Sequence, residues 1–153
     1  MRKIALLMVV STLLAPAVFA APTDEEVEAA FTGVFTAYGA LFLTSMMGQT
    51  ITGVTMDMNM ESGESALHME NVDVEALFTA IGETMDGTDD MPEITFTHLS
   101  GAIISNSEGE MNMDVTLKGS SVNRLEMQIK NEELVQLKAN GKNYDYLKDA
   151  MNF

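Results

Sequence analysis

The sequence predicts an α+β domain: a twisted antiparallel sheet of about six strands, with a long N-terminal helix and one or two short helices packed on its apolar face. Three observations lead to this fold class. A helix-forming run occupies residues 23–47, several later segments alternate apolar and polar side chains, and short turn sequences join those segments. Strands joined by short turns pair antiparallel, and their alternation leaves one apolar sheet face for the helices to cover.

The N-terminal helix has a well-specified start. Thr23 and Glu26 have the spacing of a capping box, in which the threonine hydroxyl accepts from the Glu26 amide and the carboxylate accepts from the Thr23 amide. Asp24 and Glu25 add negative charge at the positive end of the helix dipole. No charged residue occurs between positions 29 and 56, which predicts that both sides of the later turns are covered.

This helix is expected to present two unlike faces, because successive side chains are about 100° apart around the axis. We expect the bulky face to meet the sheet; it consists of Val27, Phe31, Val34, Phe35, Tyr38, Phe42 and Met46. The small face would meet another segment of the chain or a second copy. For a homodimer we expect contacts through Gly33, Ala37 and Ala40, since small residues let backbones approach closely. A stable membrane span is not expected, because threonines, serines and glycines interrupt the run.

A hairpin and a second helix should follow. Residues 54–61 and 65–72 alternate around a polar turn at residues 62–64, which predicts two paired strands. Asn71 or Asp73 can then cap a short amphipathic helix that ends before Gly82.

A four-strand meander and a closing helix should complete the domain. The strands are expected at residues 94–98, 111–118, 122–130 and 134–139, and residues 102–104 suggest either a continuation of the first or a bulge. Tyr144, Leu147 and Met151 recur at helical spacing, which predicts a short C-terminal helix. The way in which the hairpin joins the meander is left open.

Residues 1–20 have the features of a secretory signal peptide. Arg2 and Lys3 precede an apolar run, and Val18 and Ala20 are small residues placed for cleavage after Ala20. The remaining residues, 21–153, are expected to form one α+β domain in the periplasm or outside the cell. The chain contains no cysteine, which excludes both a disulfide and a lipid anchor on cysteine.

Charge is distributed unevenly along the chain. Removal of Arg2 and Lys3 with the signal leaves 6 Lys and Arg against 23 Asp and Glu, a net charge of −17. Residues 21–117 contain 18 of these acids and no Lys or Arg, whereas all six bases fall within residues 118–153. Nucleic acid and anionic lipid headgroups would be repelled, so we expect neither as a partner. The acids serve either solubility or a basic partner.

The leading functional hypothesis is a non-catalytic envelope protein that binds an apolar ligand or a partner protein between the N-terminal helix and the sheet. Methionine is a flexible side chain suited to irregular cores and apolar pockets. The expected pocket residues are Phe31, Phe35, Tyr38, Phe42, Met56, Met58 and Met113. A self-associating structural protein is an alternative. No cofactor is expected.

A copper carrier is the second alternative. Residues 56–60 place three methionines at alternate positions, which resembles the Met-x-Met pattern of periplasmic copper-handling proteins. Thioethers suit soft Cu(I), and the resemblance implies a metal site formed by Met56, Met58, Met60, Met111, Met113 and His98. His98 is included because alternation from Ile94 and Phe96 places it on the apolar side.

Two other kinds of chemistry find little support in the sequence. The acids of residues 86–93 could supply oxygen ligands for Ca²⁺, but they lack the regular order of a calcium loop. Neither His68 nor His98 lies in a recognisable nucleophile motif, and no phosphate-binding glycine loop is present. We therefore do not expect an enzyme.

Overall fold

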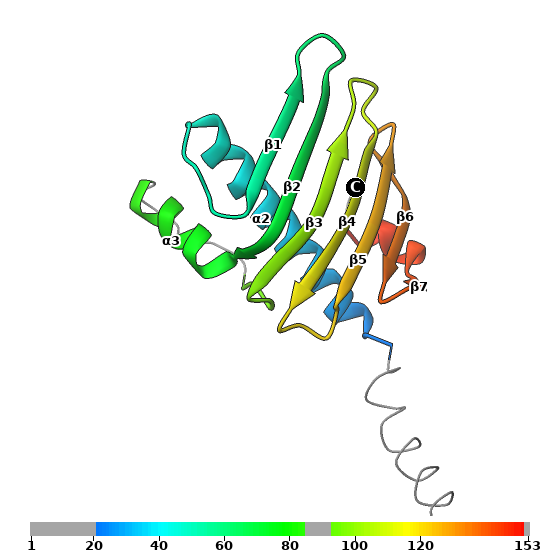
Figure 1. Cartoon of the computed structure of the whole chain (residues 1–153). Helices are drawn as coiled ribbons and strands as arrows, with labels where there is room; N and C mark the ends of the chain where they lie inside the picture. The colour runs from blue at the N-terminus through cyan, green and yellow to red at the C-terminus, as the bar shows by residue number, and fades with distance from the viewer. Residues whose placement is uncertain (1–20, 85–92, 152–153) are drawn as a thin grey trace, which may run out of the picture.

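The computed structural model describes residues 21–84 and 93–151, in which one long helix crosses behind a seven-stranded antiparallel sheet (Figure 1). The helices and strands, in chain order, are α2 (Asp24–Met46), β1 (Val54–Asn59), β2 (Glu64–Asp73), α3 (Val74–Thr84), β3 (His98–Ser105), β4 (Met111–Lys118), β5 (Arg124–Lys130), β6 (Glu133–Ala139), β7 (Lys142–Asn143) and the 3-10 helix η1 (Asp145–Asp149). This arrangement confirms the α+β class.

The sheet is one continuous meander, with the strands in the order β1-β2-β3-β4-β5-β6-β7. The hairpin joins the later strands because β2 pairs directly with β3, even though α3 lies between them in the sequence. Asp73 caps α3, with its Oδ1 accepting from the Ala76 amide at 3.1 Å. Asn71 lies instead at an irregularity in the β2–β3 pairing and has a φ of 48°.

The first helix begins as the sequence predicts. The Thr23 amide donates to Glu26 Oε2 and the Glu26 amide donates to Thr23 Oγ1, each across 3.2 Å. By length and composition alone, α2 could span a membrane, but 44% of its most apolar window is buried inside the domain. The helix therefore lies partly within the core of the domain, against the sheet.

The prediction that the bulky face of α2 would meet the core holds for Val27, Phe31 and Val34, whereas the residues of this face nearer the C-terminus lie at the edge of the core or outside it. The buried residues of this helix are Val27, Ala30, Phe31, Gly33, Val34, Ala37, Ala40, Leu41 and Thr44. Phe35, Tyr38 and Phe42 are only partly buried, and Met46 is 65% exposed.

Close packing explains why small residues of α2 are buried together with bulky ones. A Cβ on Gly33 would come within 2.8 Å of Phe96 Cε1, so any other residue here would require the aromatic ring to shift. Since Gly33, Ala37 and Ala40 are buried within the chain itself, they are not accessible to a second copy.

The apolar face of the sheet is organised in rows that run across the strands. One row crosses six strands, with each residue paired to the next: Met56, Leu67, Ile103, Met113, Met127 and Leu137. The last five members of this row are at most 3% exposed, so side chains fill the space between α2 and the sheet at this level. The expected chamber between helix and sheet is therefore occupied by core.

Two segments differ from their predicted form. The strand expected at residues 94–98 begins only at His98 and continues to Ser105, while Phe96 is buried in the segment before it. The expected short C-terminal helix forms as the 3-10 helix η1 rather than as an α-helix, the two-residue strand β7 precedes it, and Tyr144 and Leu147 are buried as their spacing predicts.

Several predictions fall outside the described residues. They are the signal peptide at residues 1–20 and the calcium loop, of which only Glu93 is described. Among the described residues, no three Asp, Glu or His side chains form a group that could hold a metal ion.

Candidate binding groove

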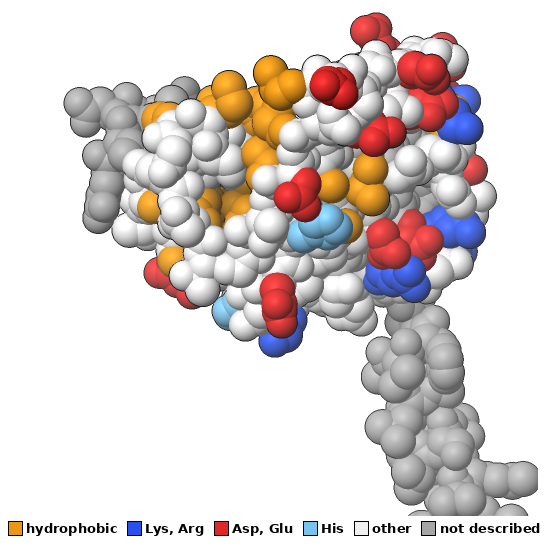
Figure 2. Space-filling model, turned by 45° about the horizontal axis from the view of Figure 1, so that its top comes forward, with side chains coloured by type: hydrophobic (Ala, Val, Ile, Leu, Met, Phe, Trp, Pro, Cys, Tyr) orange, Lys and Arg blue, Asp and Glu red, His pale blue; other side chains and the backbone are white. Residues whose placement is uncertain are grey.

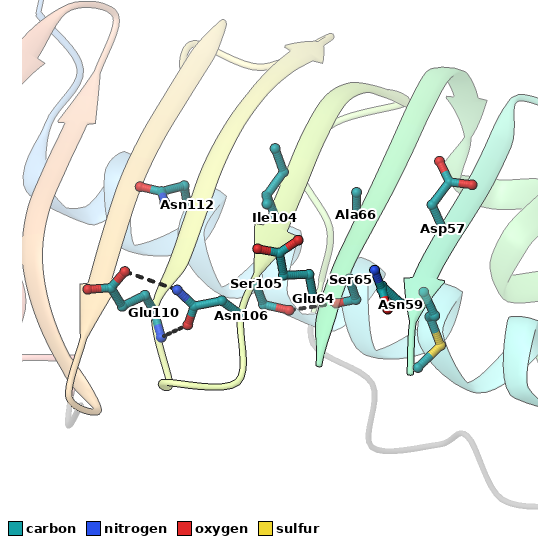
Figure 3. A pocket seen from close by; sticks show the side chains of 11 residues that line it. Asp57, Asn59, Glu64, Ser65, Ala66, Ile104, Ser105, Asn106, Glu110 and Asn112 are labelled. Atoms are coloured by element: carbon teal, nitrogen blue, oxygen red, sulfur yellow. Dashed lines mark hydrogen bonds between the residues drawn. The ribbon is translucent and has the colours of Figure 1, made fainter. Parts of the chain in front are cut away.

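A groove of about 400 Å³ lies at one end of the sheet, where the β1–β2 and β3–β4 turns come together (Figure 3). It opens on the face of the sheet opposite α2, where no helix among the described residues covers the strands. Its lining consists of Asp57, Met58, Asn59, Glu64, Ser65, Ala66, Ile104, Ser105, Asn106, Glu110 and Asn112.

The floor of the groove is a row of four side chains that is apolar at its two central positions, and it follows from the register of four strands. Asp57 pairs with Ala66, Ala66 with Ile104, and Ile104 with Asn112, so these side chains form one row on the outer face. Ile104 is 49% exposed there, beside the small Ala66. Apolar surface on an uncovered sheet face is available to a ligand.

The two turns at the end of the groove are fixed by asparagine side chains. Asn59 Oδ1 accepts from the amides of Glu61 and Ser62 at 3.0 and 3.3 Å. Asn106 Oδ1 accepts from the amides of Glu108 and Glu110, both at 3.0 Å. Such side-chain bonds to the following backbone are what favours asparagine in turns.

The turns also hold each other and one carboxylate in place. Asn106 Nδ2 donates to Glu110 Oε2 at 3.0 Å, which orients that side chain beside the groove (Figure 3). A Cβ on Gly63 would come within 2.7 Å of Ser107 Cβ, so the β1–β2 turn rests directly against the β3–β4 turn. On the apolar face, Ser65 and Ser105 share a hydrogen bond of 2.6 Å between their hydroxyls.

The groove carries negative charge without a neutralising base. Asp57, Glu64 and Glu110 contribute three carboxylates, and in the described part of the chain none of them makes an ion pair. Lys118 is the only Lys or Arg on strands β1 to β4, and it lies at the opposite end of β4, where it donates to Asn71 Oδ1. A cation brought by a ligand would therefore meet carboxylates without a competing base.

On the neighbouring strands β4 and β5, by contrast with the groove, the carboxylates are paired with a base. Arg124 Nη2 lies 2.8 Å from Asp114 Oδ2, and its Nε lies 3.3 Å from Glu126 Oε1. The hydrogen bond from Arg124 lowers the pKa of the Asp114 carboxyl below its ordinary value. In the view of Figure 2, most basic side chains gather on one side next to acidic ones, and hydrophobic side chains reach the surface on the other.

The residues predicted to form an apolar pocket are dispersed. Phe31 and Met113 are 6% and 2% exposed and belong to the core, and Phe35, Tyr38 and Met56 pack against that core from its edge. Phe42 is partly buried on α2. Of the seven, only Met58 lines the groove.

The methionines predicted to bind copper do not come together. Met56 and Met113 lie in one row, but Leu67 and Ile103 stand between them, so three strand spacings of about 4.8 Å each separate their backbones. Ser65 and Ser105 separate Met58 from Met111 in the same way. Met60 lies in the β1–β2 turn and is 88% exposed.

The prediction that His98 lies on the apolar face is wrong. Leu99 is fully buried, so the side chain of His98 alternates to the outer face, away from Met111 and Met113. The prediction assumed that side chains alternate between the two sheet faces from Ile94 to His98. This alternation does not hold, because residues 93–97 are not in a strand. His98 Nδ1 instead lies 3.0 Å from Thr97 Oγ1, and among the described residues no carboxylate is hydrogen-bonded to the ring.

Most of the groove could not be identified from the sequence. Glu64, Asn106 and Glu110 look like ordinary turn residues, and Ala66, Ile104 and Asn112 belong to the solvent-facing half of each alternating pattern. The available signals were the outward position of a large aliphatic residue, Ile104, and the absence of Lys and Arg from residues 21–117.

Comparison of the chain with protein-family models gives no match, and comparisons with curated proteins and with solved structures give none either.

Proposed function

We propose that this chain is an exported, non-catalytic binding protein. In this proposal the groove of Figure 3 holds a ligand or protein segment that combines apolar surface with positive charge. Export is supported by the composition of residues 1–20, with a basic start, an apolar run and small residues before the expected cleavage point. The compartment would be the periplasm or the cell exterior.

The observation that carries the proposal is the combination of charge and apolar surface in one groove. Ala66 and Ile104 offer an uncovered apolar floor, while the carboxylates around it have no basic partner in the described structure. Binding sites typically join an apolar lining to a few polar groups that orient the ligand. A ligand that is only apolar would leave the carboxylates unpaired, and a ligand that is only positively charged would leave the apolar floor uncovered.

The groove replaces the chamber expected between helix and sheet as the place of binding. Core side chains fill that interior, whereas the groove is open. Met58 belongs both to the predicted pocket and to the groove. A partner from the cell envelope with a basic, partly apolar segment has the matching chemistry.

The proposal is tested by titrating the isotope-labelled mature protein with a peptide of alternating Lys and Leu, followed by amide chemical shifts. We expect shifts concentrated on Asp57, Ala66, Ile104 and Asn112. A peptide of alternating Glu and Leu is the matched probe and should give none. Shifts that are equal for both peptides, or that lie outside the groove, would contradict the proposal.

Charge-neutralising variants measure the contribution of the carboxylates. Asp57→Asn and Glu64→Gln should each raise the Kd for the Lys and Leu peptide by about twofold to fivefold, as expected for exposed ion pairs. Glu75→Gln on α3 removes one negative charge away from the groove and should leave the Kd unchanged apart from general screening. An equal effect of all three variants would indicate nonspecific attraction to an acidic protein.

A further inference from the structure

One edge of the sheet carries backbone groups without partners. β1 is the first strand in the sheet order, so it has a neighbour on only one side. The Gly53 carbonyl accepts from the Glu70 amide at 2.7 Å, which makes this a hydrogen-bonded pair. Such pairs alternate along an antiparallel ladder, so the backbone groups of Thr55 and Asp57 also point toward β2.

The backbone groups of the intervening residues point away from the sheet. They are the N–H and C=O groups of Met56 and Met58 and the C=O of Val54, and in the described structure no hydrogen bond satisfies them. The Val54 amide is the exception, since it donates to the Ile51 carbonyl at 3.2 Å. These free groups form a template for one more strand.

The two edges of the sheet differ in how they are protected. At the far edge, β7 has only two residues, one of which is Lys142, and η1 follows directly. Short length and lysine are both features that prevent strand addition. β1 has six residues, contains no lysine or proline, and carries one charge, on Asp57. Only the β1 edge is suited to pairing.

An apolar surface lies beside this edge. In Figure 1 the C-terminal end of α2 extends past β1. The exposed large side chains at this end are apolar: Leu43, Met46 and Met47 are 49%, 65% and 52% exposed. The inner face of an additional strand could pack on this surface, as Val54 and Met56 of β1 pack against the core.

We propose that two copies of this chain pair through their β1 strands, antiparallel, with the twofold axis at Met56. The N–H and C=O of Met56 would bond to those of Met56 in the second copy, and the Met58 amide would donate to the Val54 carbonyl across the axis. Val54 and Met58 then meet on the inner face, and Asp57 stands opposite Thr55 on the outer face.

Side-chain chemistry disfavours two alternative registers. Centring the pair on Asp57 would place two aspartates directly opposite each other, which is destabilising. A shift of one residue would bring the methionines of one copy against the outer face of the other. Residues 29–56 of each chain are uncharged, and the one charge on β1, that of Asp57, faces Thr55 of the second copy, so the interface needs no basic residue.

The association is expected to stop at two copies. Both β1 edges are consumed by the pairing, and the two-residue β7 edge cannot extend the sheet. The pairing uses the backbone edge of β1. Asp57 and Met58 of this strand also line the groove, so the two sites are adjacent, and the cross-linking tests report on the pairing alone.

The absence of cysteine makes a cross-linking test direct. In the proposed register the two Met56 Cα atoms lie about 5.5 Å apart, within the roughly 4.4–6.8 Å that a disulfide spans. Met56→Cys should therefore form a covalent dimer on mild oxidation. Met58→Cys is the matched control, because its two Cα atoms would be about 13 Å apart along the strands, and it should stay monomeric on a non-reducing gel.

A second pair of variants avoids any disturbance of the core. Thr55→Cys and Asp57→Cys both lie on the exposed outer face, with Cα atoms about 4.5 Å apart across the proposed axis. Mixing the two proteins should give a cross-linked heterodimer, while each alone should give much less product. Equal cross-linking of all single variants would indicate random collision and overturn the proposal.

Sedimentation equilibrium of the unmodified mature protein provides the independent measurement. We expect the weight-average mass to rise with concentration toward twice the monomer mass and to stop there. A monomer mass throughout the concentration series, or growth beyond a dimer, would overturn the proposal. A dimer whose cross-links form at Met58→Cys but not at Met56→Cys would also overturn it, by showing a different register.

Discussion

The Tyr144 hydroxyl donates a hydrogen bond of 2.6 Å to the carbonyl oxygen of Pro22, two residues before α2 begins. Both residues are buried, and 122 positions separate them in the sequence. This bond ties the C-terminal segment to the N-terminal end of the main core helix. A buried carbonyl without a partner is unfavourable, so the contact should matter for the stability of the whole domain.

Replacement of Tyr144 by phenylalanine tests this contact. Tyr144→Phe keeps the ring but removes the hydroxyl, which leaves the Pro22 carbonyl unsatisfied and should lower the free energy of unfolding by about 1–3 kcal/mol. Urea denaturation followed by circular dichroism measures the change. Tyr146→Phe is the matched control, since its hydroxyl bonds to Asp24 at an exposed position and its loss should have a smaller effect near neutral pH.

Tyr146 predicts a specific response to alkaline pH. Its hydroxyl donates to Asp24 Oδ1 at 2.6 Å, and this bond, with desolvation and the Asp24 charge, raises the pKa of Tyr146 to about 12 from the ordinary value of 10.0. The folded protein therefore holds this proton more tightly than the unfolded chain. The resulting stabilisation is complete below pH 10 and is lost as the pH rises from 10 toward 12.

The measurement compares the free energy of unfolding of the wild type and Tyr146→Phe over this pH range. Burial also raises the pKa values of Tyr38 and Tyr144, but both proteins keep these residues, so the difference isolates Tyr146. The wild type should lose its advantage over the variant between pH 10 and 12. A difference that does not change with pH would show that the bond to Asp24 does not control the ionisation.

Local features of the fold were predictable because the interactions that create them lie close together in the sequence. The capping box at Thr23 and Glu26 joins residues three positions apart, and it forms as expected. Alternation along β4 likewise gives buried Met113, Val115 and Leu117 without knowledge of the partner strands. Such patterns specify both the element and the face that it buries.

The orientation of α2 was not predictable because it depends on a distant residue. Bulk alone suggested that Phe35, Tyr38 and Phe42 would enter the core, but the helix approaches Phe96 through Gly33. The sequence shows a face of small residues and leaves open whether the chain itself or another molecule covers it. The structure shows that the chain covers it.

The groove could not be predicted from the sequence for a related reason. Its floor runs across strands, from Asp57 through Ala66 and Ile104 to Asn112, and no strand contributes more than one residue of that row. A site formed in this way becomes visible only when the strand order and register are known. The copper hypothesis shows the converse, since Met56 and Met113 look alike in sequence but are separated by two strands.

Two glycines of α2 provide a matched test of how closely this helix is packed. Gly33 and Gly39 both lie in the helix, where replacement by alanine should stabilise by about 1 kcal/mol through backbone propensity alone. A Cβ at Gly39 meets nothing within 4 Å, so Gly39→Ala should show this gain. A Cβ at Gly33 would lie 2.8 Å from Phe96 Cε1. The strain of such overpacking, about 1–3 kcal/mol, should exceed the gain and make Gly33→Ala destabilising.

Urea denaturation of both variants measures whether each substitution stabilises or destabilises the protein. Phe96→Leu then tests whether contact with the Phe96 ring causes the loss in Gly33→Ala. Phe96 is 4% exposed, so its ring cannot swing freely away from a new methyl group. In Gly33→Ala combined with Phe96→Leu, the smaller side chain makes room, and the loss should be less than the sum of the two single losses. If Gly33→Ala instead stabilises as much as Gly39→Ala, the ring yields without strain, and close approach to Phe96 does not explain the glycine.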